Sequence, residues 1–157
     1  MTVQEVRVER LPVKVFANRR ELDEASAREA AVVLGTAIRA RGVAHAMFAT
    51  GNSQLGFLDA LTRQADVAWS RVVLFHMDEY LGLDDAHPAS FARYIRERIT
   101  DVVSPRDVHY ISGTASDAQV ECERYSRLLR AHPLDLCCLG IGENGHLAFN
   151  DPPVADL

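Results

Sequence analysis

Short apolar runs alternate along the chain with longer stretches in which apolar residues recur every three or four positions. The runs lie at residues 13–16, 44–49, 72–75, 108–111 and 134–139. Their lengths are typical of β-strands, and the last run has the continuous apolar character of a strand buried on both faces. The longer stretches have helical periodicity. Strands that alternate with helices form right-handed βαβ units, so the sequence predicts a Rossmann-like, three-layer α/β/α fold with a mostly parallel sheet.

Capping residues mark the expected starts of three helices. Asn18 and Glu21 have the spacing of a capping box, and so do Ser116 and Gln119. Ser90 stands directly before the apolar face of a further helix and is its expected N-cap.

Length and composition are those of one globular domain. The chain has 157 residues, of which 48% are apolar and 25% charged, so residues 1–157 are expected to form a single domain with its own core. The sequence stops directly after a polar loop, with nothing to cover the last predicted strand. We therefore expect this domain to be part of a longer protein and incomplete at its C-terminal end.

Charge and hydropathy exclude several classes of partner. The net charge of −5 gives no broad attraction to nucleic acid or to anionic membranes. No apolar run approaches the length that spans a bilayer, and the N-terminus has no signal-peptide block. Cys122, Cys137 and Cys138 lack metal-type spacing, which favours reduced thiols and a cytoplasmic location. The adjacent pair is interpreted as apolar filler of the last strand, with a reactive thiol as the alternative.

Three polar clusters, at residues 50–53, 78–80 and 144–151, each follow a predicted strand directly. The carboxyl ends of parallel strands lie along one edge of the sheet, and ligands bind at that edge. We therefore expect the three clusters to converge, although they are far apart in the sequence.

The first cluster, Thr50-Gly51-Asn52-Ser53, lies between a strand and a helix. Such a turn can aim backbone N–H groups at a phosphate, and the helix N-terminus adds favourable partial charge. The alternative is an ordinary turn in which Asn52 or Ser53 caps the helix. The turn is not a Walker loop, because no Gly-Lys-Ser/Thr follows it.

The second cluster places the carboxylates Asp78 and Glu79 at the end of a strand. Neighbours in an extended chain point in opposite directions, so only one of them is expected to face the cleft. A carboxylate shielded there has a raised pKa and can serve as a base. The alternative is a solvated acidic loop.

The third cluster is a glycine-rich turn, residues 140–145, followed by His146 and Asp151. A histidine and a carboxylate held in such a loop indicate proton transfer near neutral pH. The glycines formally match a dinucleotide fingerprint, but the prolines at 152–153 exclude the helix that NAD binding needs. A metal site made of His146, Asp151 and His76 lacks a recognised ligand spacing, so no metal is predicted.

Three segments together resemble one known family. They are Ala49-Thr-Gly-Asn-Ser-Gln-Leu-Gly56, then Met77-Asp-Glu-Tyr-Leu-Gly-Leu83 with His-Pro-x-Ser90, and then Gly140-Ile-Gly-Glu-Asn-Gly-His-Leu-Ala-Phe-Asn-Asp-Pro152. In this order they resemble the glucosamine-6-phosphate deaminase (isomerase) family, from about Lys14 to Asp151. The related 6-phosphogluconolactonases have Asp-Glu-Arg at the second motif and a Gly-His-x-Ala-Ser type of third motif.

The resemblance implies conversion of glucosamine 6-phosphate and water into fructose 6-phosphate and ammonia, without a metal or organic cofactor. It assigns Asp78 to the base that moves a proton between C2 and C1, and His146 to opening of the sugar ring. It assigns Asn144 and Asp151 to orienting this histidine, and the turn at residues 50–53 to the phosphate. The remaining candidates for substrate binding are Glu79 and Gly145.

Two substitutions and the length of the chain separate this sequence from the family pattern. Many members carry Asp at Asn144 and Glu at Asp151, and the family chain continues past this point with basic residues that grip the phosphate. A lactonase-like hydrolase and a non-catalytic domain that binds sugar phosphates therefore stay open as alternatives. The expected partner is a small sugar phosphate in each case, and a homo-oligomer is left open.

Overall fold

The computed structural model describes residues 2–148 and 150–151. Phe149 and Pro152 of the third motif lie outside the described residues, as does the proline at 153 whose effect on a following helix was predicted.

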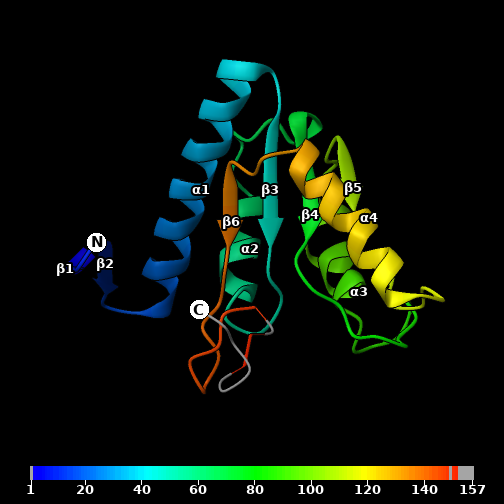
Figure 1. Ribbon diagram of the computed structural model, residues 1–157. Helices are drawn as coiled ribbons and strands as arrows, with labels where there is room; N and C mark the ends of the chain where they lie inside the picture. Colours follow the sequence, from blue (N-terminus) through cyan, green and yellow to red (C-terminus); the bar gives the residue numbers. More distant parts are fainter. Residues whose placement is uncertain (1, 149, 152–157) are drawn as a thin grey trace.

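A parallel sheet of four strands, in the order β5-β4-β3-β6, forms the centre of the molecule (Figure 1). The strands are β1 (Thr2–Val8), β2 (Leu11–Phe16), β3 (Ala44–Phe48), β4 (Val72–His76), β5 (Asp107–His109) and β6 (Leu136–Cys138). The helices are α1 (Arg19–Arg41), α2 (Leu55–Thr62), α3 (Phe91–Ile95) and α4 (Ala118–Ala131), with the short 3₁₀-helix η1 (Trp69–Arg71) and the short π-helix η2 (Arg96–Thr100). The predicted α/β fold with a parallel sheet is therefore confirmed.

Alternation along β3 and β4 divides the core into two layers. Ala46 and Leu74 point to one face, where they belong to the larger apolar cluster with residues of α1 and α2. Met47 and Phe75 point to the other face, where they pack with Tyr125 of α4. Helices thus cover both faces, as the alternation of strands and helices in the sequence predicted.

Two of the three predicted caps are confirmed and one is wrong. The Asn18 side chain accepts a hydrogen bond from Glu21 N at 3.0 Å, and Ser90 caps α3. The cap of α4 is Asp117, whose carboxylate accepts from two backbone N–H groups of the first turn, and not Ser116. A carboxylate at this position also interacts favourably with the positive end of the helix, which the neighbouring hydroxyl cannot match.

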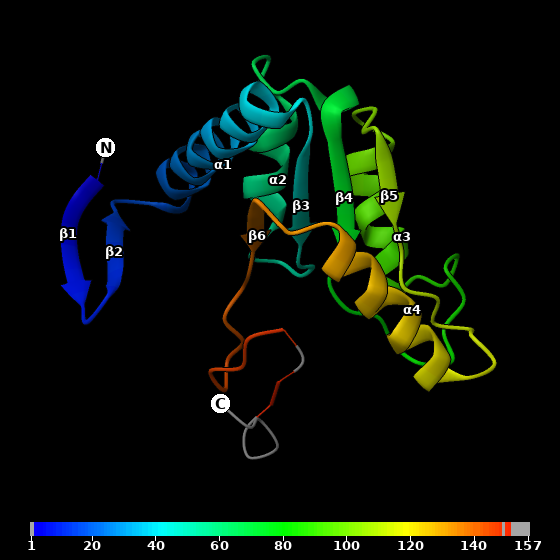
Figure 2. The same cartoon turned by 45° about the horizontal axis from the view of Figure 1, so that its top comes forward.

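The N-terminal segment differs from the prediction. Residues 13–16 were expected to open the parallel sheet, but β2 pairs antiparallel with β1 in a separate hairpin. Figure 2 shows this hairpin apart from the parallel sheet, beyond the start of α1. The alternation of charged residues with valine along β1 is the pattern of a hairpin strand, and the Val6 and Val8 side chains are exposed together with the charged ones.

The last strand is shorter and more exposed than predicted. The run 134–139 was expected to be buried on both faces, but only Leu136–Cys138 is extended, and it pairs with β3 at the edge of the described sheet. Cys138 packs against the larger core cluster, whereas Cys137 is exposed. The interpretation of both cysteines as buried filler is therefore wrong for Cys137, because no described element covers that face of β6.

The longest described helix is α1, with 23 residues. Its buried positions are mostly alanines, which lets it pack closely on α2 and β3. Its remaining faces carry charged residues together with the exposed side chains of Leu22 and Val32. Among the described helices none is both long and apolar enough to cross a membrane.

Candidate functional site

A cavity of about 240 Å³ lies at the carboxyl ends of β3, β4 and β6. The arrows of these strands point toward the loops that form it in Figure 1. Its lining includes members of all three polar clusters and their neighbours: Ala49, Thr50, Gly51, Ser53, Asp78, Phe91, Gly140, Ile141, Gly142, His146 and Ala148. The predicted convergence of the three clusters is confirmed, and Asp78 and His146 face one common space.

Asp78 is the carboxylate at the centre of this arrangement. It is half-buried, and burial raises its pKa above the ordinary value of 3.8. The negative charge of Glu79 raises the pKa further, while His146 lowers it. A carboxylate with a raised pKa holds a proton more tightly, so Asp78 is a better base than an ordinary surface aspartate.

His146 is oriented by Asp151 and Asn144. Its Nδ1 lies 2.7 Å from Asp151 Oδ1. Asn144 Nδ2 donates to the same carboxylate oxygen at 2.9 Å, and Asn144 Oδ1 accepts from the His146 N–H at 3.1 Å. The hydrogen bond from Asn144 is the main reason that the pKa of Asp151 is lowered. The side-chain amide of Asn144 thus links the backbone of His146 to the ionised carboxylate of Asp151, which lies beside the imidazole.

The glycines of the third cluster make room for this histidine. A Cβ on Gly142 would lie 2.3 Å from His146 Cε1, and a Cβ on Gly140 would lie 2.8 Å from Ser53 Oγ. Gly145 has a φ of +85°, and its N–H donates to the Gly142 carbonyl at 2.9 Å. The glycine-rich sequence therefore permits a ring contact and a close approach between two loops, instead of the dinucleotide turn that its spacing suggests.

The turn at residues 50–53 has backbone groups that are free to bind a ligand. Gly51 has a φ of +110°, and Gln54, without a side-chain capping bond, is the N-cap of α2. The alternative in which Asn52 or Ser53 caps this helix is therefore wrong. The N–H groups of Gly51, Asn52 and Ser53 have no acceptor among residues 2–148 and 150–151. Such a turn can bind an anion through its amides.

Glu79 lies outside the cavity, so only one of the two adjacent carboxylates faces it, as predicted. Its oxygens accept from the Ser90 hydroxyl at 2.7 Å, from Ala92 N at 2.9 Å and from Phe91 N at 3.1 Å. Burial acts to raise its pKa, but these hydrogen bonds outweigh it and the pKa is lowered. This geometry holds the start of α3 and offers the carboxylate no path to a ligand in the cavity.

Not all of the residues predicted for substrate binding line the cavity. Asn52 and Gly145 do not line the cavity. Phe91, Ile141 and Ala148 also line it, although none of the three was a candidate site residue from the sequence. For Phe91 the signal was its position directly after Ser90 of the second motif, although helical periodicity assigned it to the apolar face.

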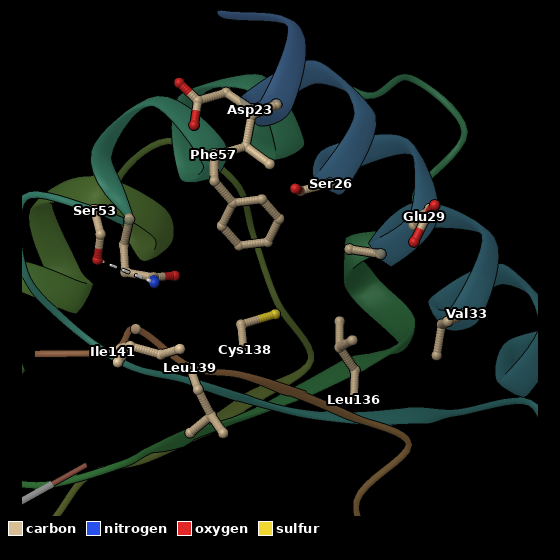
Figure 3. Close-up of a pocket in the computed structure, with 14 residues that line it drawn as sticks. Asp23, Ser26, Glu29, Val33, Ser53, Phe57, Leu136, Cys138, Leu139 and Ile141 are labelled. Carbon is tan, nitrogen blue, oxygen red and sulfur yellow. Dashed lines mark hydrogen bonds between the residues drawn. The ribbon is translucent and has the colours of Figure 1, made fainter. Parts of the chain in front are cut away.

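A second cavity, of about 490 Å³, lies between α1, α2 and β6. The Phe57 ring and the Cys138 sulfur point into it (Figure 3), and Leu136 and Leu139 complete its apolar wall. Asp23 and Glu29 also line it, but none of its lining residues is a histidine. Among the residues that the structure describes, no group of three or more His, Cys, Asp or Glu could hold a metal ion.

Comparison with known sequences gives a consistent result. A family model described as glucosamine-6-phosphate isomerases/6-phosphogluconolactonase matches residues 17–149. The chain is 41% identical over 107 residues to a glucosamine-6-phosphate deaminase of Exiguobacterium sp. (strain ATCC BAA-1283 / AT1b), and 43% identical over 110 residues to one of Arthrobacter sp. (strain FB24). These matches cover 68% and 66% of this chain but 42% of each relative, so the chain spans less than half their length.

Solved structures from two branches resemble the fold. A monomeric glucosamine-6-phosphate deaminase superposes with a TM-score of 0.77 and 28% identity, over 87% of this chain and 57% of that one. A 6-phosphogluconolactonase from Shewanella baltica OS155 superposes with a TM-score of 0.73 and 25% identity, over 84% and 57%. The fold alone therefore does not separate the two activities.

Proposed function

Because the chain belongs to the glucosamine-6-phosphate isomerase/6-phosphogluconolactonase family, as its three motifs predicted, we propose that its site deaminates glucosamine 6-phosphate. The products are fructose 6-phosphate and ammonia. The observation that carries the proposal is that Asp78, with a raised pKa, and His146, with its carboxylate partner, line one cavity beside a turn with free amides.

The first step is opening of the sugar ring by His146. Its Nδ1 is turned toward Asp151, which leaves Nε2 to move a proton between the anomeric hydroxyl and the ring oxygen. The negative charge of Asp151 stabilises the imidazolium that forms when the imidazole of His146 takes up this proton. Asn144 keeps that carboxylate in place but adds no charge of its own.

The second step is proton transfer by Asp78. Its carboxylate takes the proton from C2 of the open-chain aldehyde, and the C2 electron pair forms the C1=C2 double bond of an enolamine while the aldehyde oxygen takes up a proton from the ammonium group of the substrate. The proton held by Asp78 is then delivered to C1, which leaves a protonated imine at C2. Water adds to this imine and ammonia leaves, giving fructose 6-phosphate. A half-buried base is suited to removing a proton next to a carbonyl, because desolvation strengthens it.

The phosphate of the substrate is assigned to the turn at residues 50–53. Three N–H groups there, at the start of α2, have no acceptor within the described part of the chain and give an anion-binding surface in a chain whose net charge is −5. Because the relatives are more than twice as long as the matched region, further phosphate contacts from a longer protein are part of this proposal.

The lactonase alternative is favoured by the structural likeness to the Shewanella enzyme. Tyr80 stands after Asp78-Glu79, where the resemblance places arginine in lactonases, and this supports the deaminase instead. A domain that binds sugar phosphates without turnover is the third possibility.

One experiment separates these alternatives. The protein is incubated with glucosamine 6-phosphate and, in parallel, with 6-phosphogluconolactone, and ammonia, fructose 6-phosphate and acid are measured together with binding. The proposal predicts release of ammonia and fructose 6-phosphate in equal amounts, and loss of both in Asp78→Asn with binding retained. Acid release from the lactone alone supports the lactonase. Binding that is unaffected by Asp78→Asn, without any turnover, supports the regulatory domain.

A further inference from the structure

Two side chains from distant elements bind the turn at residues 50–53 through its carbonyl oxygens. The Tyr94 hydroxyl, on α3, donates to the Gly51 carbonyl at 2.9 Å. The Arg19 guanidinium, in the first turn of α1, donates to the Asn52 carbonyl. These are successive carbonyls, and neither donor was selected from the sequence.

Fixing a carbonyl also fixes the amide on the other side of the same peptide bond. A trans peptide unit is planar, and its C=O and N–H point in opposite directions. The bond from Tyr94 to the Gly51 carbonyl therefore sets the direction of the Asn52 N–H. In the same way, the bond from Arg19 sets the direction of the Ser53 N–H. These are two of the N–H groups that have no acceptor within the described residues.

The backbone of the turn needs such support. Gly51 has a φ of +110°, with open space around the position of a Cβ, so packing against it does not hold the conformation. Its carbonyl has one local partner, the Gln54 N–H at 3.1 Å. The hydroxyl of Tyr94 adds the contact that comes from another element, and residues 51–53 are otherwise exposed.

Positive charge lies near the same turn. Burial raises the pKa of Tyr94, while the charges of Arg98 and Arg19 act to lower it, so both guanidinium groups are close enough to influence the hydroxyl. Asp23 lies 3.7 Å from Arg19 Nε and balances part of that charge.

The same short helix also connects the turn to the proposed base. Glu79, the neighbour of Asp78, accepts hydrogen bonds from the start of α3, and Tyr94 lies one turn further along that helix. A contact at each end of one rigid element fixes the separation between the turn and the base loop.

From these contacts we infer that Tyr94 and Arg19 are positioning residues that hold the amides of residues 52 and 53 in the direction that binds the phosphate of the substrate. The inference rests on the proposed function, because it takes the turn as the phosphate site. Neither side chain is required to touch the sugar.

The test uses Tyr94→Phe, which removes only the hydroxyl, and Arg19→Gln. Tyr110→Phe is the matched control, because it also removes one tyrosine hydroxyl. That hydroxyl lies 3.5 Å from Thr100 Oγ1, and neither Tyr110 nor Thr100 lines the cavity. Two quantities are measured on each protein. The first is the ¹⁵N order parameter of the amides of residues 51–53 without ligand. The second is the affinity for glucosamine 6-phosphate, for inorganic phosphate and for glucosamine, which lacks the phosphate.

The inference predicts lower order parameters in the turn for Tyr94→Phe and for Arg19→Gln. It also predicts weaker binding of glucosamine 6-phosphate and of inorganic phosphate, by about 2- to 10-fold for Tyr94→Phe, with unchanged affinity for glucosamine. The Tyr110→Phe control should match the wild type in all these measurements.

Unchanged order parameters in the turn would overturn the inference, and so would an equal loss of affinity for glucosamine 6-phosphate and glucosamine. If the wild type does not distinguish these two ligands, the proposed phosphate site itself is wrong. In that case the order parameters still decide whether Tyr94 and Arg19 hold the turn.

Discussion

The imidazole of His146 lies directly against Gly142, where a Cβ would come within 2.3 Å of the ring. The Gly142 N–H also donates to the His146 carbonyl at 2.9 Å, so the two residues are joined through both backbone and ring. The glycine is therefore a requirement of the histidine geometry, because any side chain at this position occupies the space of the ring.

Gly142→Ala tests this relationship. The added methyl group must displace the ring, and a displacement of about 1 Å at a reacting group lowers the rate about 100-fold. We expect ammonia release from glucosamine 6-phosphate to fall by at least about 10-fold, with little change in thermal stability. Gly35→Ala is the control: its Cβ meets only the flexible end of Arg39, at 3.2 Å. It should leave activity unchanged and stabilise α1 by about 0.5–1 kcal/mol. Equal activity of the two variants would contradict the assignment.

The pH dependence of activity should follow Asp78. The base must be ionised, and burial raises its pKa, so kcat/KM should fall as the pH drops through a value above the ordinary 3.8 of aspartate. A profile of kcat/KM between about pH 3 and pH 8, with thermal melts at each pH to exclude unfolding, checks this expectation. An acidic limb at or below the ordinary aspartate value would show that the essential base is another group.

The same raised pKa makes a prediction about stability. The folded state binds the Asp78 proton more tightly than the unfolded state does, so stability is lost as the pH rises through the unfolded pKa toward the folded one. At neutral pH the buried charge is therefore unfavourable, and Asp78→Asn should melt at a higher temperature than the wild type. The difference should shrink toward pH 4, where both states begin to take up the proton. A lower melting temperature for Asp78→Asn at pH 7 would contradict the burial of this charge.

Glu79 should contribute to stability instead of to binding. Its carboxylate accepts from the backbone N–H groups of Phe91 and Ala92, and an amide at this position turns a donor toward one of them. We expect Glu79→Gln to lower the free energy of unfolding by about 1–2 kcal/mol in denaturant titrations. Because its pKa is lowered, this stabilisation is present above the unfolded pKa and is lost as the pH falls through the folded value. The control Glu97→Gln removes an exposed ion pair with Arg93, which solvent screens, and should lower stability much less than Glu79→Gln does.

Local patterns in the sequence predicted most of the fold. The apolar runs predicted the central strands, and the capping box of Asn18 and Glu21 predicted the start of α1. Both signals depend only on residues that are close together in the sequence. The errors arose where tertiary contacts decide. The burial of Cys137 depends on whether another element covers that face of β6. The N-cap of α4 is Asp117, because its carboxylate accepts the hydrogen bonds of the first turn better than the hydroxyl of the adjacent Ser116.

The site was predictable for a similar reason, and only in part. Parallel strands bring their carboxyl ends to one edge, so the meeting of Asp78 and His146 followed from topology. Tyr94 and Arg19 contact the turn at residues 50–53 from α3 and α1. These contacts join residues that are far apart in the sequence, so no local pattern predicts them. Glu79 and Asp78 are adjacent carboxylates of which only Asp78 faces the cavity; strand alternation predicted this difference but not the hydrogen bonds that Glu79 makes.

The most direct measurement follows the proton that Asp78 is proposed to carry between C2 and C1. Fructose 6-phosphate and ammonium are incubated with the protein in D₂O, and the C1 protons are followed by NMR. The account predicts that one C1 proton is replaced by deuterium with the wild type, and that Asp78→Asn slows this exchange at least about 100-fold while it still binds the sugar phosphate. Exchange at the wild-type rate in Asp78→Asn, or no exchange in a wild-type protein that binds fructose 6-phosphate, would contradict it.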